Sequence, residues 1–332
     1  SISINLNIVR RMHTFIKGIE YFLPEKRESN ADLKIDNPDW IIDDIEKKTG
    51  VTTRRISSNN QTATDLAEEA CKKLIKSGLE TQDIDFIILV TQSPDYTLPT
   101  SACILQDRLG VGSCIAFDVN LGCSGFVYGL AISSSLISSG LAKQGILVCS
   151  DTYTKYIDKN DRTCRPLFSD AAAAVHISIA KDDLMGPFEL GTDGSGFDKL
   201  IVPSSGSRID SCGMVENRLY MSGADVFMFT MDMVPKAVNS LLYKSDKKIE
   251  DIDLFIFHQA SKLVIDSIIR RLDLPEDKVF VNMKDIGNTV SATIPIALSD
   301  AIKDNRINTG DLIMLVGFGV GYSWGGCLIK WQ

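Results

Sequence analysis

The chain carries the stretch DIDFIILV at residues 83–90 and a close copy of it, DIDLFIF, at residues 251–257. Each copy has an acidic start and a continuous apolar run, which is typical of a strand buried on both faces of a sheet. A second pair follows at a similar interval, because GILV at residues 145–148 resembles DLIMLV at residues 311–316. The sequence therefore contains an internal duplication whose copies lie about half the chain length apart.

Helical segments separate the repeated strands. Residues 63–76 and residues 261–272 both have apolar positions on one face, and Ser261 is a suitable N-cap for the second helix. This alternation predicts an α/β protein with parallel-type sheets covered by helices, built from two fused and similar halves. We place the halves at residues 1–184 and 185–332, with a glycine-rich, loop-rich join over residues 185–222.

The composition excludes several classes of protein. With 332 residues, 44% of them apolar and 23% charged, the chain can bury a large core. A net charge of −8 argues against general nucleic-acid binding, which needs a basic surface. The eight cysteines form no CxxC pair, so a zinc ribbon or a thioredoxin-type site is not expected, and we predict no metal. Buried, reduced thiols are typical of a cytoplasmic protein.

Two apolar segments bear on membrane insertion. Residues 119–142 carry no charge but are rich in glycine and serine, which predicts a buried helix of a globular core instead of a membrane span. The segment from Ile2 to Ile8 is short and interrupted by asparagines, so we expect no signal peptide there.

Three polar residues stand at the ends of repeated segments. Cys123 follows Gly122 where a strand should turn into a helix, and the unsatisfied N–H groups of a helix start favour a thiolate. Asn288 follows a glycine at the related position of the second copy, and His258 ends the repeated strand. Each alone is commonly a buried thiol, a turn residue or a core histidine, so the prediction of a catalytic site rests on all three.

A glycine-rich run, GFGVGYSWGG, occupies residues 317–326. Its pattern could suggest a dinucleotide-binding fingerprint, but aromatic residues follow where such a fingerprint needs a helix and a later acidic residue. Exposed backbone N–H groups in such a run suit an oxyanion hole, which stabilises the negative charge on a reacting carbonyl.

Together these segments resemble the β-ketoacyl-acyl-carrier-protein synthase III family of the thiolase superfamily. The resemblance covers nearly the whole chain and rests on residues 21–24, 30–33, 118–130, 168–175, 258–260, 287–289 and 318–326. It implies a five-layered αβαβα fold, with the nucleophilic cysteine in the N-terminal half and the histidine and asparagine in the C-terminal half. It also implies a homodimer.

The resemblance implies a decarboxylating Claisen condensation, of the kind that begins fatty acid biosynthesis. Cys123 would be acylated by an acyl-CoA or acyl-carrier starter, and malonyl-acyl-carrier-protein would then supply an enolate, giving a 3-oxoacyl thioester. His258 and Asn288 would donate hydrogen bonds to the thioester oxygen, and backbone N–H groups at Cys123 and Val320 would form the oxyanion hole. No cofactor is expected, because coenzyme A and phosphopantetheine arrive with the substrates.

The family pattern also suggests substrate contacts. Trp40 matches a tryptophan that stacks on the CoA adenine, Leu98 matches an acyl-pocket residue that is often phenylalanine, and Phe318 matches a residue beside the thiol. The family's CoA-binding arginines are absent, and either Lys48 or Lys262 could replace them, although lysine differs from arginine in geometry.

Other functions stay open from the sequence. One is acyl transfer to an amine or alcohol in a surface-glycan or secondary-metabolite pathway, and another is a non-catalytic partner subunit. Hydroxymethylglutaryl-CoA synthase is disfavoured, because no glutamate stands in an equivalent motif. The acyl-chain length and the choice between primary fatty-acid initiation and a specialised pathway are not fixed.

Overall fold

The computed structural model describes residues 12–332, so the segment from Ile2 to Ile8 lies outside the described residues. Its first sheet has the strand order β1 (His13–Phe22), β7 (Ala171–Ala180), β6 (Gln144–Asp151), β4 (Phe86–Val90) and β5 (Ile115–Val119). Strand β4 is parallel to both β5 and β6, whereas β7 is antiparallel to β6 and β1. All five residues of β4 are buried, as its continuous apolar run predicts.

The second sheet repeats this arrangement. Its order is β8 (Met185–Thr192), β13 (Ser323–Lys330), β12 (Leu312–Gly319) and β11 (Leu254–Phe257). The pair β11–β12 is parallel and the other two pairs are antiparallel. In the first sheet β5 follows β4 at the edge. In the second sheet no full strand takes this place beside β11 within the described residues, and an isolated parallel bridge joins Phe255 of β11 to Val279. The shared order confirms the duplication predicted from the repeated stretches.

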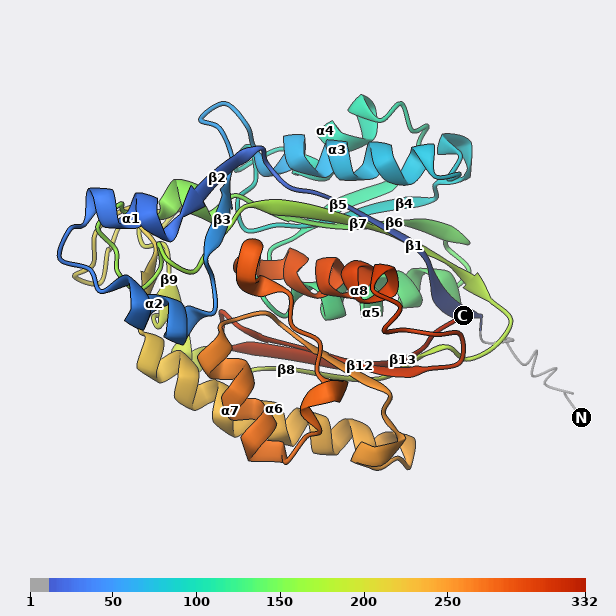
Figure 1. Cartoon of the computed structure of the whole chain (residues 1–332). Coiled ribbons are helices and arrows are strands. Elements are labelled where there is room, and N and C mark those ends of the chain that lie inside the picture. Colours follow the sequence, from blue (N-terminus) through green and yellow to red (C-terminus); the bar gives the residue numbers. More distant parts are fainter. Residues whose placement is uncertain (1–11) are drawn as a thin grey trace, which may run out of the picture.

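Helices complete five layers, α on β on α on β on α (Figure 1). Helices α3 (Ala63–Lys76) and α4 (Ser101–Arg108) cover the outer face of the first sheet. Helices α5 (Gly125–Ser138) and α8 (Thr293–Lys303) lie between the sheets, and α6 (Gly223–Ser245) and α7 (Lys262–Leu272) cover the second sheet. The predicted N-cap holds, since the Ser261 hydroxyl accepts from the Val264 N–H at 3.2 Å.

Helix α5 approaches the first sheet closely at a glycine. A Cβ at Gly129 would lie 2.5 Å from Leu147 of β6, so any larger residue would push the helix away from the sheet. The uncharged segment is thus a buried helix of the central layer. Within residues 12–332, no helix is both long and apolar enough to span a membrane.

A side lobe contains the remaining regular elements. It holds β2 (Lys26–Ser29), α1 (Asn30–Asp36), α2 (Ile42–Thr49) and β3 (Thr53–Ile56), and α2 packs against α7 of the second half. Two short strands, β9 (Leu200–Ile201) and β10 (Tyr220–Met221), pair nearby. Short 3₁₀ turns occupy Thr81–Asp83, Tyr153–Tyr156, Gly194–Gly196, Ile249–Asp251, Glu276–Lys278, Met283–Asp285 and Val290–Ala292.

The structure corrects one prediction about the join. Residues 185–192 were expected to be loop but form β8, a strand of the second sheet. The glycine that suggested a loop, Gly191, pairs with Trp324 of β13, and a Cβ there would collide with the indole ring. Gly191 is therefore needed by its aromatic cross-strand partner, which local sequence reading cannot detect.

Candidate active site

Cys123 lies in the turn between β5 and α5, just before the N-cap residue Ser124. The β12–β13 hairpin of the second half closes over it. A Cβ at Gly317 would lie 2.5 Å from the Cys123 carbonyl oxygen, and one at Gly319 would lie 2.9 Å from the Cys123 Sγ. Ser124 Oγ is also hydrogen-bonded to Ser323 Oγ at 2.7 Å. The two halves thus meet at Cys123, which is only 4% exposed.

Burial governs the charge of this thiol. It raises the pKa of Cys123 to about 12, and hydrogen bonds from the backbone N–H groups of Val320 and Cys123 itself oppose this rise. The N–H groups at the helix start favour the thiolate, as expected, but desolvation by burial has the larger and opposite effect on the pKa of Cys123. Those two N–H groups both lie within hydrogen-bonding reach of the sulfur.

His258 follows β11 and is 2% exposed. Its backbone N–H donates to the Val316 carbonyl of β12 at 2.9 Å, which continues the parallel pairing by one residue. Burial lowers the pKa of His258 to about 3, so the ring is neutral at physiological pH. The Nδ1 atom lies 2.7 Å from Thr293 Oγ1, and the ring meets Phe318 edge-on at 5.5 Å between centroids.

Asn288 is held by backbone bonds to the first half. Its N–H donates to the Leu167 carbonyl at 2.9 Å, and its carbonyl accepts from the Ser169 N–H at 2.8 Å. These bonds aim its side chain at His258, whose Nε2 lies 3.4 Å from Asn288 Nδ2. His258 and Asn288, which the sequence placed at the ends of repeated segments, are thus direct neighbours.

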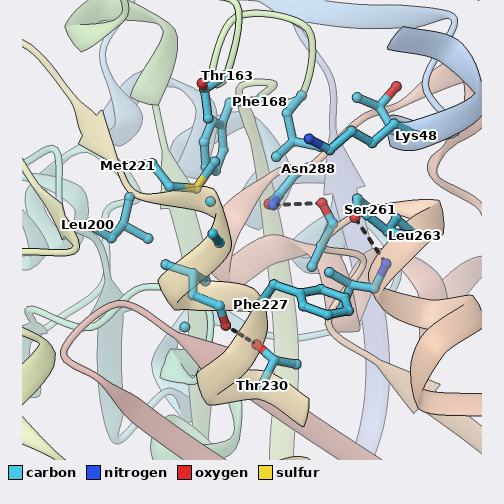
Figure 2. A pocket seen from close by; sticks show the side chains of 18 of the residues that line it. Lys48, Thr163, Phe168, Leu200, Met221, Phe227, Thr230, Ser261, Leu263 and Asn288 are labelled. Atoms are coloured by element: carbon cyan, nitrogen blue, oxygen red, sulfur yellow. Dashed lines mark hydrogen bonds between the residues drawn. The ribbon is translucent and has the colours of Figure 1, made fainter. Parts of the chain in front are cut away.

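All three side chains line one cavity of about 730 Å³. Figure 2 shows Asn288 facing it together with the apolar side chains of Phe168, Leu200 and Met221. Two cationic residues, Lys48 and Arg162, and one acidic residue, Asp44, also line it. The cavity therefore combines a buried thiol, two neutral polar groups, apolar walls and positive charge.

The other residues singled out in the sequence fall in different places. Phe318 and Lys48 line the cavity, whereas Lys262 does not and instead pairs with Asp266 on the exposed face of α7. Trp40 is 5% exposed and packs with Leu33 and Ile45 in the side lobe. Leu98 is 80% exposed in the single chain and lies outside the cavity.

Sequence reasoning missed several residues of this site. Arg162 and Thr293 stand in no repeated or glycine-marked pattern, so no local signal identified them. Asp151, at the end of β6, was also missed, although it accepts hydrogen bonds from the Gln92 N–H at 2.7 Å and from Ser93 Oγ at 3.0 Å. Burial raises the pKa of Asp151 to about 7. Among residues 12–332, no group of three or more His, Cys, Asp or Glu side chains could hold a metal ion.

Comparisons with known proteins agree on one family. The family described as 3-oxoacyl-(acyl-carrier-protein) synthase III matches residues 117–194, and its C-terminal part matches residues 242–331. The β-ketoacyl-(acyl-carrier-protein) synthase III of Natranaerobius thermophilus is 39% identical over 321 residues, which cover 93% of this chain and 96% of that protein.

Solved structures give the same result. A crystal structure of a 3-oxoacyl-(acyl-carrier-protein) synthase III superposes with a TM-score of 0.91 at 42% identity, covering 96% of this chain and 100% of the other. The β-ketoacyl-(acyl-carrier-protein) synthase III of Thermus thermophilus superposes with a TM-score of 0.90 at 33% identity, with 96% and 99% covered.

Proposed function

The chain belongs to the 3-oxoacyl-(acyl-carrier-protein) synthase III family, and we propose that Cys123, His258 and Asn288 perform the reaction of that family in it. The enzyme is a condensing acyltransferase of fatty acid biosynthesis. It joins an acyl-CoA starter to malonyl-acyl-carrier-protein with loss of CO₂ and yields a 3-oxoacyl thioester.

In the first stage, Cys123 Sγ attacks the carbonyl carbon of the acyl thioester. A carbon–sulfur bond forms to Cys123, the bond to the CoA sulfur breaks, and the thiol proton leaves on CoA. The carbonyl oxygen gains negative charge during the attack, and the N–H groups of Val320 and Cys123 are the donors closest to the reacting sulfur. A hole made of backbone donors needs no reorganisation as the charge develops.

In the second stage, the malonyl thioester loses CO₂ and becomes an enolate, whose carbon attacks the acyl-Cys123 carbonyl. A carbon–carbon bond forms and the bond to Cys123 breaks, which releases the product and leaves a Cys123 thiolate that takes up a proton from solvent. Asn288 Nδ2 is a neutral donor in the cavity, so it can stabilise the enolate oxygen without protonating it. His258 is also neutral there, because burial holds its pKa near 3.

The observation that carries this proposal is the convergence of residues from both halves on one cavity. The experiment is intact-mass analysis of the protein after exposure to a panel of acyl-CoA and acyl-carrier donors, with CO₂ release from malonyl-acyl-carrier-protein followed in parallel. We expect one acyl adduct in the wild type and no adduct or condensation in Cys123→Ala. Cys71→Ala, which removes a buried thiol remote from the cavity, is the matched control. Condensation that survives in Cys123→Ala would disprove the role of Cys123.

The positive charge of the cavity suits the phosphates of CoA and of phosphopantetheine. Lys48 and Arg162 are the residues we propose for these contacts, which leaves Lys262 outside the binding site. No cofactor of its own is proposed for the enzyme, because both substrates carry their thiol groups with them. Free cysteines, five of them buried, support a reducing location, and we propose the cytoplasm.

A homodimer is the proposed assembly. The edge strand β5 pairs only with β4 within the described chain and its residues are half-buried, so its outer edge is open to a second copy. Leu98 and Tyr96 stand exposed in the segment that follows β4. Light scattering should give twice the mass of one chain, and Leu98→Asp should lower that mass at equal concentration. A wild-type protein with the mass of a single chain would contradict the proposal.

A further inference from the structure

Protein atoms fill the space beside Gly122, the residue that precedes Cys123. A Cβ at Gly122 would lie 2.6 Å from Gln92 Oε1, 2.6 Å from Val320 Cγ1 and 3.3 Å from the Tyr153 hydroxyl oxygen. Neither Gln92 nor Tyr153 lines the cavity, although both approach the turn that carries the thiol. On this side of Cys123 the cavity is therefore closed.

The Tyr153 ring stands directly behind the cavity wall. It packs in the same apolar cluster as Cys123, and two further members of that cluster, Phe168 and Leu200, line the cavity. The centroids of the Tyr153 and Phe168 rings are 5.3 Å apart, and Tyr153 is only 3% exposed. The phenol thus occupies space that would otherwise be continuous with the surroundings of the thiol.

Hydrogen bonds hold the ring in this place. The Tyr153 hydroxyl donates to Gln92 Oε1, and the Gln92 side-chain nitrogen donates to Asn120 Oδ1 at 3.2 Å. The Gln92 backbone is fixed as well, since its N–H donates to Asp151 Oδ1 at 2.7 Å. Rotating the phenol away would leave a buried hydroxyl without a partner, which is unfavourable.

From this packing we propose that Tyr153, held by Gln92, is a specificity-determining residue that limits the acyl group on Cys123 to about two to four carbon atoms. The role rests on the proposed function, in which Cys123 accepts the acyl group of a thioester. The acyl chain and the phosphopantetheine arm leave the thioester carbonyl carbon in different directions. While the arm occupies the cavity, the acyl chain therefore points past the thiol, toward the phenol.

A longer acyl chain would have to displace this ring and break its hydrogen bond to Gln92. Protein interiors are closely packed, and a single methylene group that a pocket does not accommodate changes a rate by about 10–200-fold. We therefore expect octanoyl-CoA to acylate Cys123 at least about 10²-fold more slowly than acetyl-CoA.

The test measures initial rates of Cys123 acylation by intact mass, with acetyl-, butyryl-, hexanoyl- and octanoyl-CoA as donors. Tyr153→Ala removes the phenol, so the ratio of the octanoyl rate to the acetyl rate should rise at least about tenfold. Tyr153→Phe keeps the ring and loses only the hydrogen bond, so the ratio should rise by a smaller factor, about two- to fivefold. Tyr243→Ala makes the same truncation at an 89% exposed position of α6 and should keep the wild-type ratio.

Two results would overturn the inference. One is a wild-type protein that octanoyl-CoA acylates within about threefold of the acetyl-CoA rate, which needs no variant. The other is a Tyr153→Ala protein that folds and keeps the wild-type ratio. If thermal unfolding shows that Tyr153→Ala does not fold, Tyr153→Leu takes its place, because leucine preserves apolar burial but is shorter than the phenol.

A binding measurement separates this inference from the proposed function. In 2-oxoalkyl-CoA thioethers a CH₂ group separates the CoA sulfur from the carbonyl, so these analogues bind without transferring an acyl group. Calorimetry should show the 2-oxopropyl analogue binding wild-type protein at least about tenfold more tightly than the 2-oxononyl analogue. That result without labelling of Cys123 by any acyl-CoA would reject the transfer role and keep the size limit. Equal affinities would reject the size limit, and absence of binding by both analogues would reject both.

Discussion

Replacing Gly317 by alanine directly disturbs the contact between the two halves at Cys123. The new Cβ would lie 2.5 Å from the Cys123 carbonyl oxygen and 3.0 Å from the Ser124 Cα, both backbone atoms that cannot rotate away. Ordinary contact begins at 3.4 Å, so β12 and the Cys123 turn must separate by about 0.9 Å. That movement carries the Val320 N–H away from the sulfur.

Two magnitudes follow from this displacement. Overpacking of a tight contact costs about 1–3 kcal/mol. With an unfolding entropy of about 2.1 cal/mol/K per residue over 332 residues, Tm falls by about 1.5–4 °C. A misplacement of about 1 Å at a reacting atom costs roughly 10²-fold in rate. Acylation of Cys123 should therefore slow strongly even though the protein loses only a small part of its thermal stability.

The assay combines thermal unfolding with the initial rate of acyl-adduct formation by intact mass. Gly112→Ala is the matched control, since a Cβ there meets nothing within 4 Å. We expect this control to match the wild type in both measurements. A Gly317→Ala protein that acylates within about twofold of the wild type would refute the claim that β12 positions Cys123 for acylation.

Three further outcomes are expected. Asn288→Ala should lower CO₂ release from malonyl-acyl-carrier-protein by about 10²–10³-fold while Cys123 is still acylated, and equal losses in both steps would contradict a separate decarboxylation role. Lys48→Ala should raise the KM for acyl-CoA by about two- to fivefold and Lys262→Ala should leave it unchanged, because only Lys48 lines the cavity. Burial raises the folded pKa of Asp151 from 3.8 to about 7, so the folded state retains a proton that the unfolded state releases, and stability from this group falls as pH rises through that window. Asp151→Asn cannot lose this proton, so its Tm relative to the wild type should climb between about pH 4 and pH 7 and then level off, and a pH-independent difference would contradict the shift.

The sequence predicted the features that leave a local signal. The repeated apolar runs indicated the buried strands β4 and β11, and the shared sheet order confirms the duplication. The pairs Gly122-Cys123 and Gly287-Asn288 marked two chain turns that lie at the same cavity. A buried strand and a glycine turn are each encoded by a few consecutive residues, so they can be read without knowing the fold.

Other features depend on residues far apart in the chain. Burial raises the pKa of Cys123, and the close approach of Gly317 and Gly319 to this residue joins segments almost 200 positions apart in the sequence. Thr293 matters because its hydroxyl reaches His258 across 35 positions of sequence. Such tertiary contacts leave no periodicity to detect.

The hairpin that covers Cys123 also determines when the surroundings of this residue form during synthesis of the chain. A ribosome releases the half containing Cys123 well before residues 317–323, and domains fold largely in the order in which they emerge. Until β12 and β13 dock, the thiol has neither the Val320 N–H nor the contact with Gly319, and it resembles any cysteine of a nascent chain. The buried surroundings of Cys123 therefore form only when the last strands are in place.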